Sequence, residues 1–112
     1  MPVRSKETAT DLLFGALANP TRREILDALR DGERSAGELA SRFAMARPSV
    51  SEHLAGLRAA HLVVERRDGR RILYALDPRP LALVGSWLHP YERFWRDRLL
   101  ALEDVLDETE DR

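Results

Sequence analysis

One stretch of this 112-residue chain, residues 47–76, constrains its fold more than any other. It begins with apolar residues at Val50, Leu54 and Leu57, a spacing that places all three on one face of an α-helix. The pattern predicts a helix over residues 47–60 that buries this face. The remaining side chains near its start are polar or charged, so that end of the helix is available to a partner.

A β-hairpin is predicted directly after this helix. The segments 62–67 and 71–76 have the composition of strands, and Asp68-Gly69 between them is a strong hairpin signal. The tip reads Arg-Arg-Asp-Gly-Arg-Arg and carries four guanidinium groups. The helix and the hairpin together suit a DNA duplex, because a helix can read base edges in the major groove while a cationic hairpin holds phosphates or reaches the minor groove.

Capping signals and apolar periodicity predict four more helices. Asn19 can cap a helix whose first turn accepts Pro20, and Ser35 with Glu38 forms a capping box. Pro90 lies inside the long periodic stretch that follows the hairpin, and we expect it to kink or split that helix. The four helices are expected over residues 8–18, 20–30, 35–43 and 80–107.

The order of four helices, a hairpin and a last helix predicts a mainly α winged helix-turn-helix, as a single domain over residues 1–112. Its DNA-binding core would cover about residues 20–76. The helices at 8–18 and 80–107 would form a dimer, because their apolar faces exceed what a small monomer leaves exposed. The side chains expected at the dimer interface are Leu13, Leu17, Trp87, Tyr91, Trp95, Leu99 and Leu102.

Charge is unevenly distributed along a chain whose net charge is only −1. Residues 39–76 carry seven arginines against three acidic residues, whereas residues 96–112 carry seven acidic residues against three arginines. The basic centre favours nucleic-acid binding there. The alternative is a solvated surface on which the charges cluster by chance.

Several other classes of function are not expected. The chain has no cysteine, which excludes disulfides and thiolate metal sites, and it shows no phosphate-binding loop and no nucleophile beside a base. His89 has Glu92 nearby but no second histidine, so we interpret it as a surface or interface residue and expect neither a metal nor a cofactor. Without an 18-residue apolar run or the apolar core of a signal peptide, a cytoplasmic protein with no membrane partner is expected.

The chain resembles the ArsR-type family of winged helix-turn-helix repressors over about residues 10–78. The segments that carry the resemblance are 17–26, 35–40, 48–54, Leu57-Arg58, and the wing 67–71 followed by Tyr74. The resemblance implies a symmetric homodimer that binds a palindromic operator in double-stranded DNA and often represses its own operon. Metal sensing, which in relatives uses cysteines near positions 35–38, is not expected, because this chain has Ser-Ala-Gly-Glu there.

Carried over position by position, the resemblance implies DNA contacts from the helix at 47–60 and from the wing. The residues concerned are Arg47, Ser49, Ser51 and His53 of the helix and Arg67, Arg70 and Arg71 of the wing. Arg47 has the fork that matches the O6 and N7 acceptors of guanine, but many relatives have Gln there, so the operator sequence does not transfer. Ala46 stands where a capping Ser or Thr is usual, and Ala44 and His61 stand where Gly is common.

Two alternatives remain open at this point. The aromatic residues Trp87, Tyr91, Phe94 and Trp95 recur at helical spacing, which favours dimer packing, but they could also form a pocket for an apolar small-molecule effector. The other alternative is a winged-helix module that binds proteins and no longer binds DNA. The four arginines of the wing argue against it, because such a module would not need them.

Overall fold

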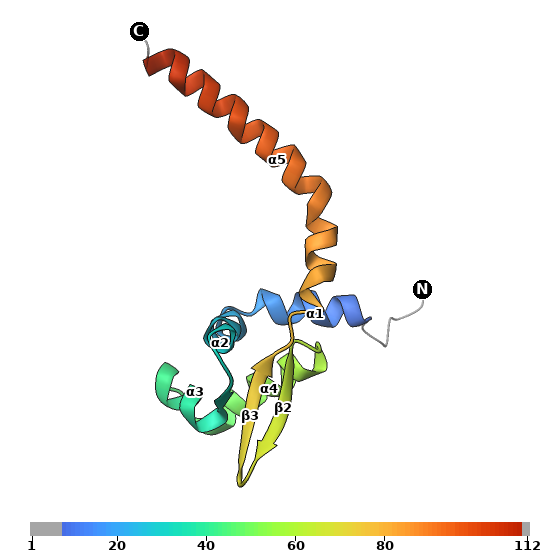
Figure 1. Cartoon of the computed structure of the whole chain (residues 1–112), viewed down its shortest axis with the longest axis vertical. Helices are drawn as coiled ribbons and strands as arrows, with labels where there is room; N and C mark the ends of the chain where they lie inside the picture. Colours follow the sequence, from blue (N-terminus) through green and yellow to red (C-terminus); the bar gives the residue numbers. More distant parts are fainter. Residues whose placement is uncertain (1–7, 111–112) are drawn as a thin grey trace, which may run out of the picture. The chain divides into compact units, whose positions relative to one another are not determined.

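The computed structural model describes residues 8–110, with side chains up to residue 108. Within that part it contains five helices and three strands (Figure 1). Their bounds are α1 Ala9–Ala18, α2 Pro20–Arg30, β1 Arg34–Ser35, α3 Ala36–Phe43, α4 Arg47–Ala59, β2 Val63–Asp68, β3 Arg71–Leu76 and α5 Leu81–Glu110. The predicted winged helix-turn-helix is confirmed, with β1 as an addition. The chain divides into two compact units, one ending at Pro80 and one beginning at Leu81, and whether they act as a single domain stays a prediction.

The predicted helix caps are confirmed. The Asn19 side chain accepts a hydrogen bond from the backbone N–H of Arg22 at 3.1 Å, and Pro20 occupies the first turn of α2. Ser35 caps α3 by accepting from the N–H of Glu38 at 3.1 Å, and the Glu38 carboxylate accepts from the Ser35 N–H at 2.9 Å. Each cap satisfies N–H groups that have no partner inside the helix.

The connections before and after α4 use residues where glycine is common. Ala44 has φ 52° and His61 has φ 61°, both in the left-handed region that favours glycine. Ala46, at the N-cap of α4, makes no side-chain hydrogen bond to the helix, as its side chain predicts. The first N–H groups of α4 therefore lack a side-chain cap.

The sheet has the strand order β1-β3-β2, with both pairings antiparallel. β1 was not predicted. The hairpin turn also differs from expectation: Asp68 pairs with Arg71 as the last rung, so the turn residues are Gly69 and Arg70 and not Asp68-Gly69. Gly69 has φ 64°, and a glycine at the first central position is typical of the tight turns that match strand twist.

The core of the first unit lies between its helices and the sheet. Its most deeply buried large side chains are Leu13, Ile25, Leu39, Val50, Leu54, Leu57 and Leu62. Leu13, expected at a dimer interface, is only 2% exposed and packs inside its own chain, whereas Leu12 is 37% exposed. The exposed face of α1 is therefore not the one that we expected: it contains Leu12 and not Leu13. Leu17 is half-buried.

The second unit consists of α5, which continues through Pro90 as one helix and is bent (Figure 1). The bend agrees with the expected kink, and α5 is not split at Pro90. None of the described side chains from Leu81 to residue 108 is buried. The Trp87 and Tyr91 rings lie 5.0 Å apart, and the Arg98 guanidinium lies 4.5 Å from the centre of the Phe94 ring. No helix in the described part of the chain is long and apolar enough to cross a membrane.

Candidate nucleic-acid interface

The helix-turn-helix is formed by α3 and α4, which pack against each other, and Leu39 of α3 and Leu54 of α4 are both buried. The start of α4 points its remaining side chains outward. Arg47, Ser49 and Ser51 are all exposed, while Val50 between them is completely buried. Burial of one face of α4 therefore leaves these three predicted DNA-contacting side chains on the surface.

A cavity of about 420 Å³ brings four of the predicted site residues together. Arg47 and Ser51 line it from α4, and Arg70 and Arg71 line it from the wing. The other lining residues are Ser35, Ala36, Gly37, Ile72 and Tyr74. The cavity thus joins the recognition helix, the start of α3 and the wing in a single concave surface. Ser49, His53 and Arg67 do not line it.

Arg47 lies over the N-terminus of α3. A Cβ atom placed on Gly37 would be 3.7 Å from the Cζ atom of Arg47, which is ordinary van der Waals contact. The guanidinium therefore stands beside the first N–H groups of α3, where the helix carries partial positive charge. Positive charge and N–H donors on one surface favour a phosphate. Sequence reasoning missed Ser35 and Gly37 as part of this surface, although the capping box marks a helix start there.

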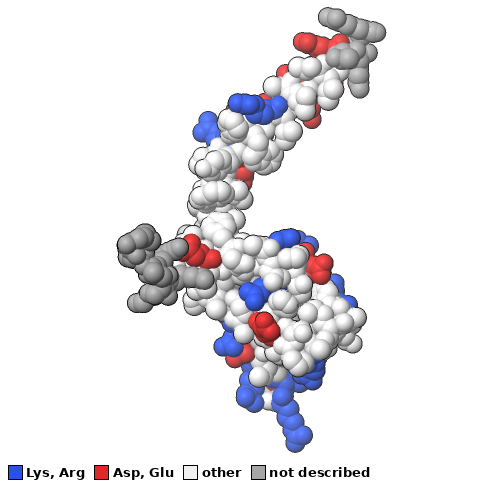
Figure 2. Space-filling view, turned by 180° about the vertical axis from the view of Figure 1, so that it is seen from behind, with Lys and Arg blue, Asp and Glu red and all other residues white. Residues whose placement is uncertain are grey.

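The cavity is electropositive because two of its arginines have no acidic partner. Among residues 8–108, neither Arg47 nor Arg70 makes an ion pair, whereas Arg71 lies 3.9 Å from Glu38 and 3.8 Å from Asp68. Figure 2 shows Arg side chains gathered at the end of the first unit where the hairpin tip lies. Unpaired guanidinium groups on a concave surface are suited to the phosphates of a nucleic-acid backbone.

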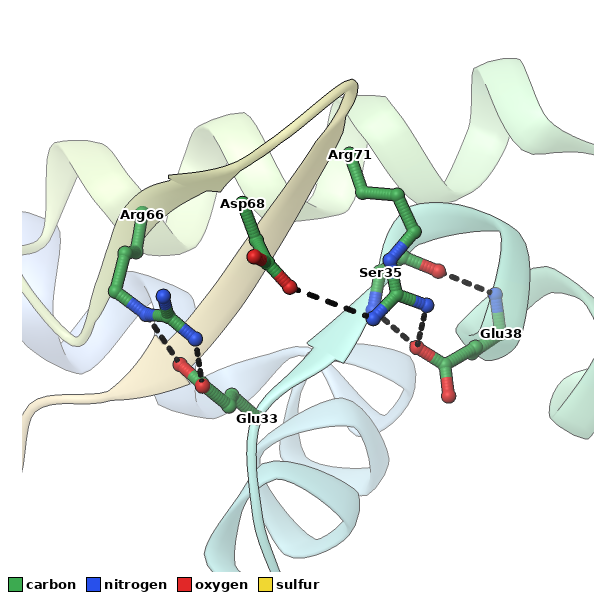
Figure 3. Close-up of polar contacts among 6 residues, drawn as sticks. All are labelled: Glu33, Ser35, Glu38, Arg66, Asp68 and Arg71. Carbon is green, nitrogen blue, oxygen red and sulfur yellow. Dashed lines mark hydrogen bonds and ion pairs between the residues drawn. The ribbon is translucent and has the colours of Figure 1, made fainter.

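Ion pairs hold the wing against the rest of the first unit (Figure 3). Arg66 of β2 donates to both carboxylate oxygens of Glu33, which directly precedes β1. These hydrogen bonds, reinforced by the positive charge of Arg66, hold the pKa of the Glu33 carboxyl below its ordinary value. On the other side, Arg71 faces Glu38 of α3. Arg66 and Arg71 thus bind the protein itself, and Arg67 and Arg70 make no ion pair among the described residues.

Two further groups around the cavity have shifted pKa values. Hydrogen bonds from Ser35, first from its backbone N–H, lower the pKa of the Glu38 carboxyl, and Arg71 acts in the same direction. Burial raises the pKa of the Tyr74 hydroxyl, and the nearby Glu65 carboxylate adds to this effect. Glu38 is therefore a carboxylate and Tyr74 a neutral phenol at neutral pH.

His53 differs from the other predicted site residues. It is half-buried, and its Nδ1 atom accepts a hydrogen bond from Nε of Arg22 in α2 at 3.3 Å. A DNA contact from His53 stays a prediction, as it does for every other predicted site residue. Arg22 was not predicted as part of the site. In the part of the chain that the structure describes, no group of three His, Asp or Glu residues could hold a metal ion.

Comparisons with known proteins agree with this geometry. A family described as "Helix-turn-helix domain" matches residues 17–66. The chain is 40% identical over 101 residues to the HTH-type transcriptional regulator Rv2034 of Mycobacterium tuberculosis, covering 90% of this chain and 92% of the relative. It is 38% identical over 76 residues to the transcriptional repressor SdpR of Bacillus subtilis, covering 68% of this chain and 84% of that protein.

Solved structures point the same way. The ArsR-like transcriptional regulator from Rhodococcus sp. RHA1 has a TM-score of 0.68 and 32% identity, and the match covers 87% of this chain and 92% of that one. Another ArsR family transcriptional regulator reaches a TM-score of 0.70 at 32% identity, covering 80% of this chain and 98% of its own. These relatives are regulators and not enzymes. The chain belongs to the ArsR family and is a transcriptional regulator with a winged helix-turn-helix DNA-binding domain.

Proposed function

We propose that this regulator binds a two-fold symmetric operator as a homodimer and represses transcription from it in the cytoplasm. The main support for DNA binding is the cavity, which is lined by four of the predicted site residues: Arg47, Ser51, Arg70 and Arg71. Affinity would come mainly from phosphate contacts of the wing and the α3 start, and specificity from α4. Repression is supported by the likeness to SdpR, which is named a transcriptional repressor.

The homodimer is supported by the exposed apolar side chains of α5. Trp95, Leu99 and Leu102 are each about half exposed, and several other large apolar residues of α5 are exposed to a similar degree. A monomer rarely leaves such a surface in water. A two-fold dimer would present two copies of α4 to successive half-sites of a palindrome, as in other helix-turn-helix proteins.

The first experiment tests the wing. The operator is first identified by selecting duplexes from a random library with the wild-type protein. Replacing Arg70 and Arg71 by Ala should weaken binding to the selected and to random duplexes alike. The slope of log K against log salt should become shallower by about 0.9 for each lost phosphate contact. Arg30→Ala, at the exposed end of α2 and outside the cavity, is the matched control. Wild-type affinity in the double variant would remove the wing from the proposal.

The second experiment tests Arg47. If its guanidinium reads a guanine, Arg47→Ala should cost about 1–3 kcal/mol on the selected operator and much less on random DNA. If it holds a phosphate, as its position over Gly37 allows, both affinities should fall together. Titrating wild type and variant against selected and scrambled duplexes separates the two roles. Equal losses on both would move the specificity to Ser49 and Ser51.

A further inference from the structure

The Arg22 side chain lies across α4 and connects it to α2. Its Nε atom donates to Nδ1 of His53 at 3.3 Å. Its guanidinium also occupies the space beside Gly56: a Cβ atom built there would lie 2.3 Å from Nη1 and 2.4 Å from Cζ of Arg22. No acidic residue pairs with Arg22 among residues 8–108. Gly56 is therefore the residue that lets the Arg22 guanidinium pack directly on the α4 backbone.

This contact is well placed to control the orientation of α4. His53 and Gly56 are three residues apart and share one face of the helix, which is a different face from buried Val50, Leu54 and Leu57. Apolar burial is non-directional, so it holds α4 against the core without strictly setting its rotation. A hydrogen bond has a preferred direction, and one that joins α4 to the capped first turn of α2 limits rotation.

We propose that Arg22, His53 and Gly56 form a positioning contact that sets how α4 presents Arg47 and Ser51 to DNA. His53 acts through Arg22 and is not itself a base-reading residue. This inference rests on the proposed DNA binding. It explains why His53 is half-buried and does not line the cavity. It also explains the glycine inside α4, where a glycine otherwise weakens a helix.

Gly56→Ala separates positioning from stability. The added Cβ displaces only the far end of the flexible Arg22 side chain, and alanine favours the helix more than glycine does. We expect a Tm equal to or above that of the wild type. Affinity for the selected operator should nevertheless fall about tenfold, because α4 would then have to be oriented on binding, and that cost is subtracted from the binding free energy. Gly15→Ala is the matched control, because nothing lies within 4 Å of its added Cβ, and it should bind as the wild type does.

Substitutions at the other end of the contact complete the test. His53→Ala should lose the same factor as Gly56→Ala, and the double variant should lose no more than either, because both remove one interaction. His53→Asn keeps an acceptor for Arg22, because its Oδ1 atom is bonded to Cγ as Nδ1 is, and should restore affinity close to that of the wild type. Sedimentation of every variant checks that the oligomeric state is unchanged.

Two results would overturn the inference alone. One is wild-type affinity in Gly56→Ala, which would show that displacing Arg22 does not matter for DNA. The other is a His53→Ala variant that relaxes the preference at one base pair of the selected duplex, which would make His53 a base reader. A wild-type protein that selects no duplex at all would instead overturn the proposed function, and this inference would fall with it.

Discussion

The two units of the chain differ in how far they bury their apolar side chains. Up to Pro80, residues such as Leu39 and Leu57 are completely buried by neighbouring helices and strands. In α5, none of the described side chains is buried, and Trp95 and Leu99 are 47% and 51% exposed. Yet both units show the same three-to-four-residue apolar spacing in the sequence. Periodicity therefore reveals that a helix has an apolar face, and it does not reveal what covers that face.

The largest expected effect is on the free energy of unfolding, and it comes from replacing one leucine in each unit, Leu13 and Leu99. Leu13→Ala should lower the free energy of unfolding by about 2–5 kcal/mol at every protein concentration, because it leaves a cavity inside the chain. Leu99→Ala removes the same group from an exposed face and should destabilise the protein by an amount that depends on concentration. Urea unfolding at several protein concentrations distinguishes the two. A concentration-dependent loss in Leu13→Ala would put that residue back at the dimer interface.

A charge on the apolar face of α5 should have the next largest effect. Trp95→Glu should weaken the dimer by about 2 kcal/mol or more, because a carboxylate would replace an aromatic side chain that the proposed dimer would bury. Sedimentation equilibrium measures the dissociation constant directly. Arg96→Glu, one residue further on, adds an acidic group on another side of the helix and is the control. If both variants remain dimers as stable as the wild type, α5 does not form the interface.

Features with a local signal could be predicted, and features made by distant contacts could not. Asn19 and Ser35 indicate helix starts because each binds an N–H only three residues away. β1 has just two residues, too few for an alternating pattern, and exists because it pairs with β3. On α1, Leu12 and Leu13 are equally apolar, so only the packed structure shows that Leu13 is the one inside.

The same distinction between local signals and distant contacts applies to the residues of the candidate site. Arg47 and Ser51 could be predicted because the buried face of α4 leaves them on the surface, and Arg70 and Arg71 because a hairpin tip is exposed. The hydrogen bond between Arg22 and His53 joins positions 31 residues apart, and neither residue type indicates it in the sequence. The start of α3 was recognised as a helix cap, but only the fold places it against Arg47.

Even the packed unit has a weak point at the start of its recognition helix. Ala46 has the extended backbone of an N-cap, φ −68° and ψ 144°, but no side chain that could accept from α4. Ala46→Ser should therefore raise the free energy of unfolding by about 1 kcal/mol. Ala59→Ser, at the other end of α4, needs no such cap and should give no gain. Urea unfolding measures both, and a serine at 46 that stabilises no more than the one at 59 would contradict the prediction.

The smallest effect concerns how firmly the wing is joined to the packed unit. Arg66 holds the pKa of Glu33 below its ordinary value of 4.5, first through hydrogen bonds and then through its charge. Because the pKa in the folded state is lowered, the contribution of this pair to stability is fully present above about pH 4.5. It is lost as the pH falls through the lower value of the folded state. Both groups are exposed, so the contribution is small.

Carboxyl NMR titration tests this attachment directly. In the wild type, Glu33 should titrate below 4.5, and in Arg66→Ala its midpoint should return towards that value. Arg67→Ala removes the neighbouring arginine, which makes no ion pair among the described residues, and should leave the Glu33 midpoint unchanged. The same midpoint in the wild type and in Arg66→Ala would mean that the wing is not held by this pair in solution. The β1–β3 pairing, the burial of Leu73 and the Arg71–Glu38 ion pair would then be what joins the wing to the packed unit.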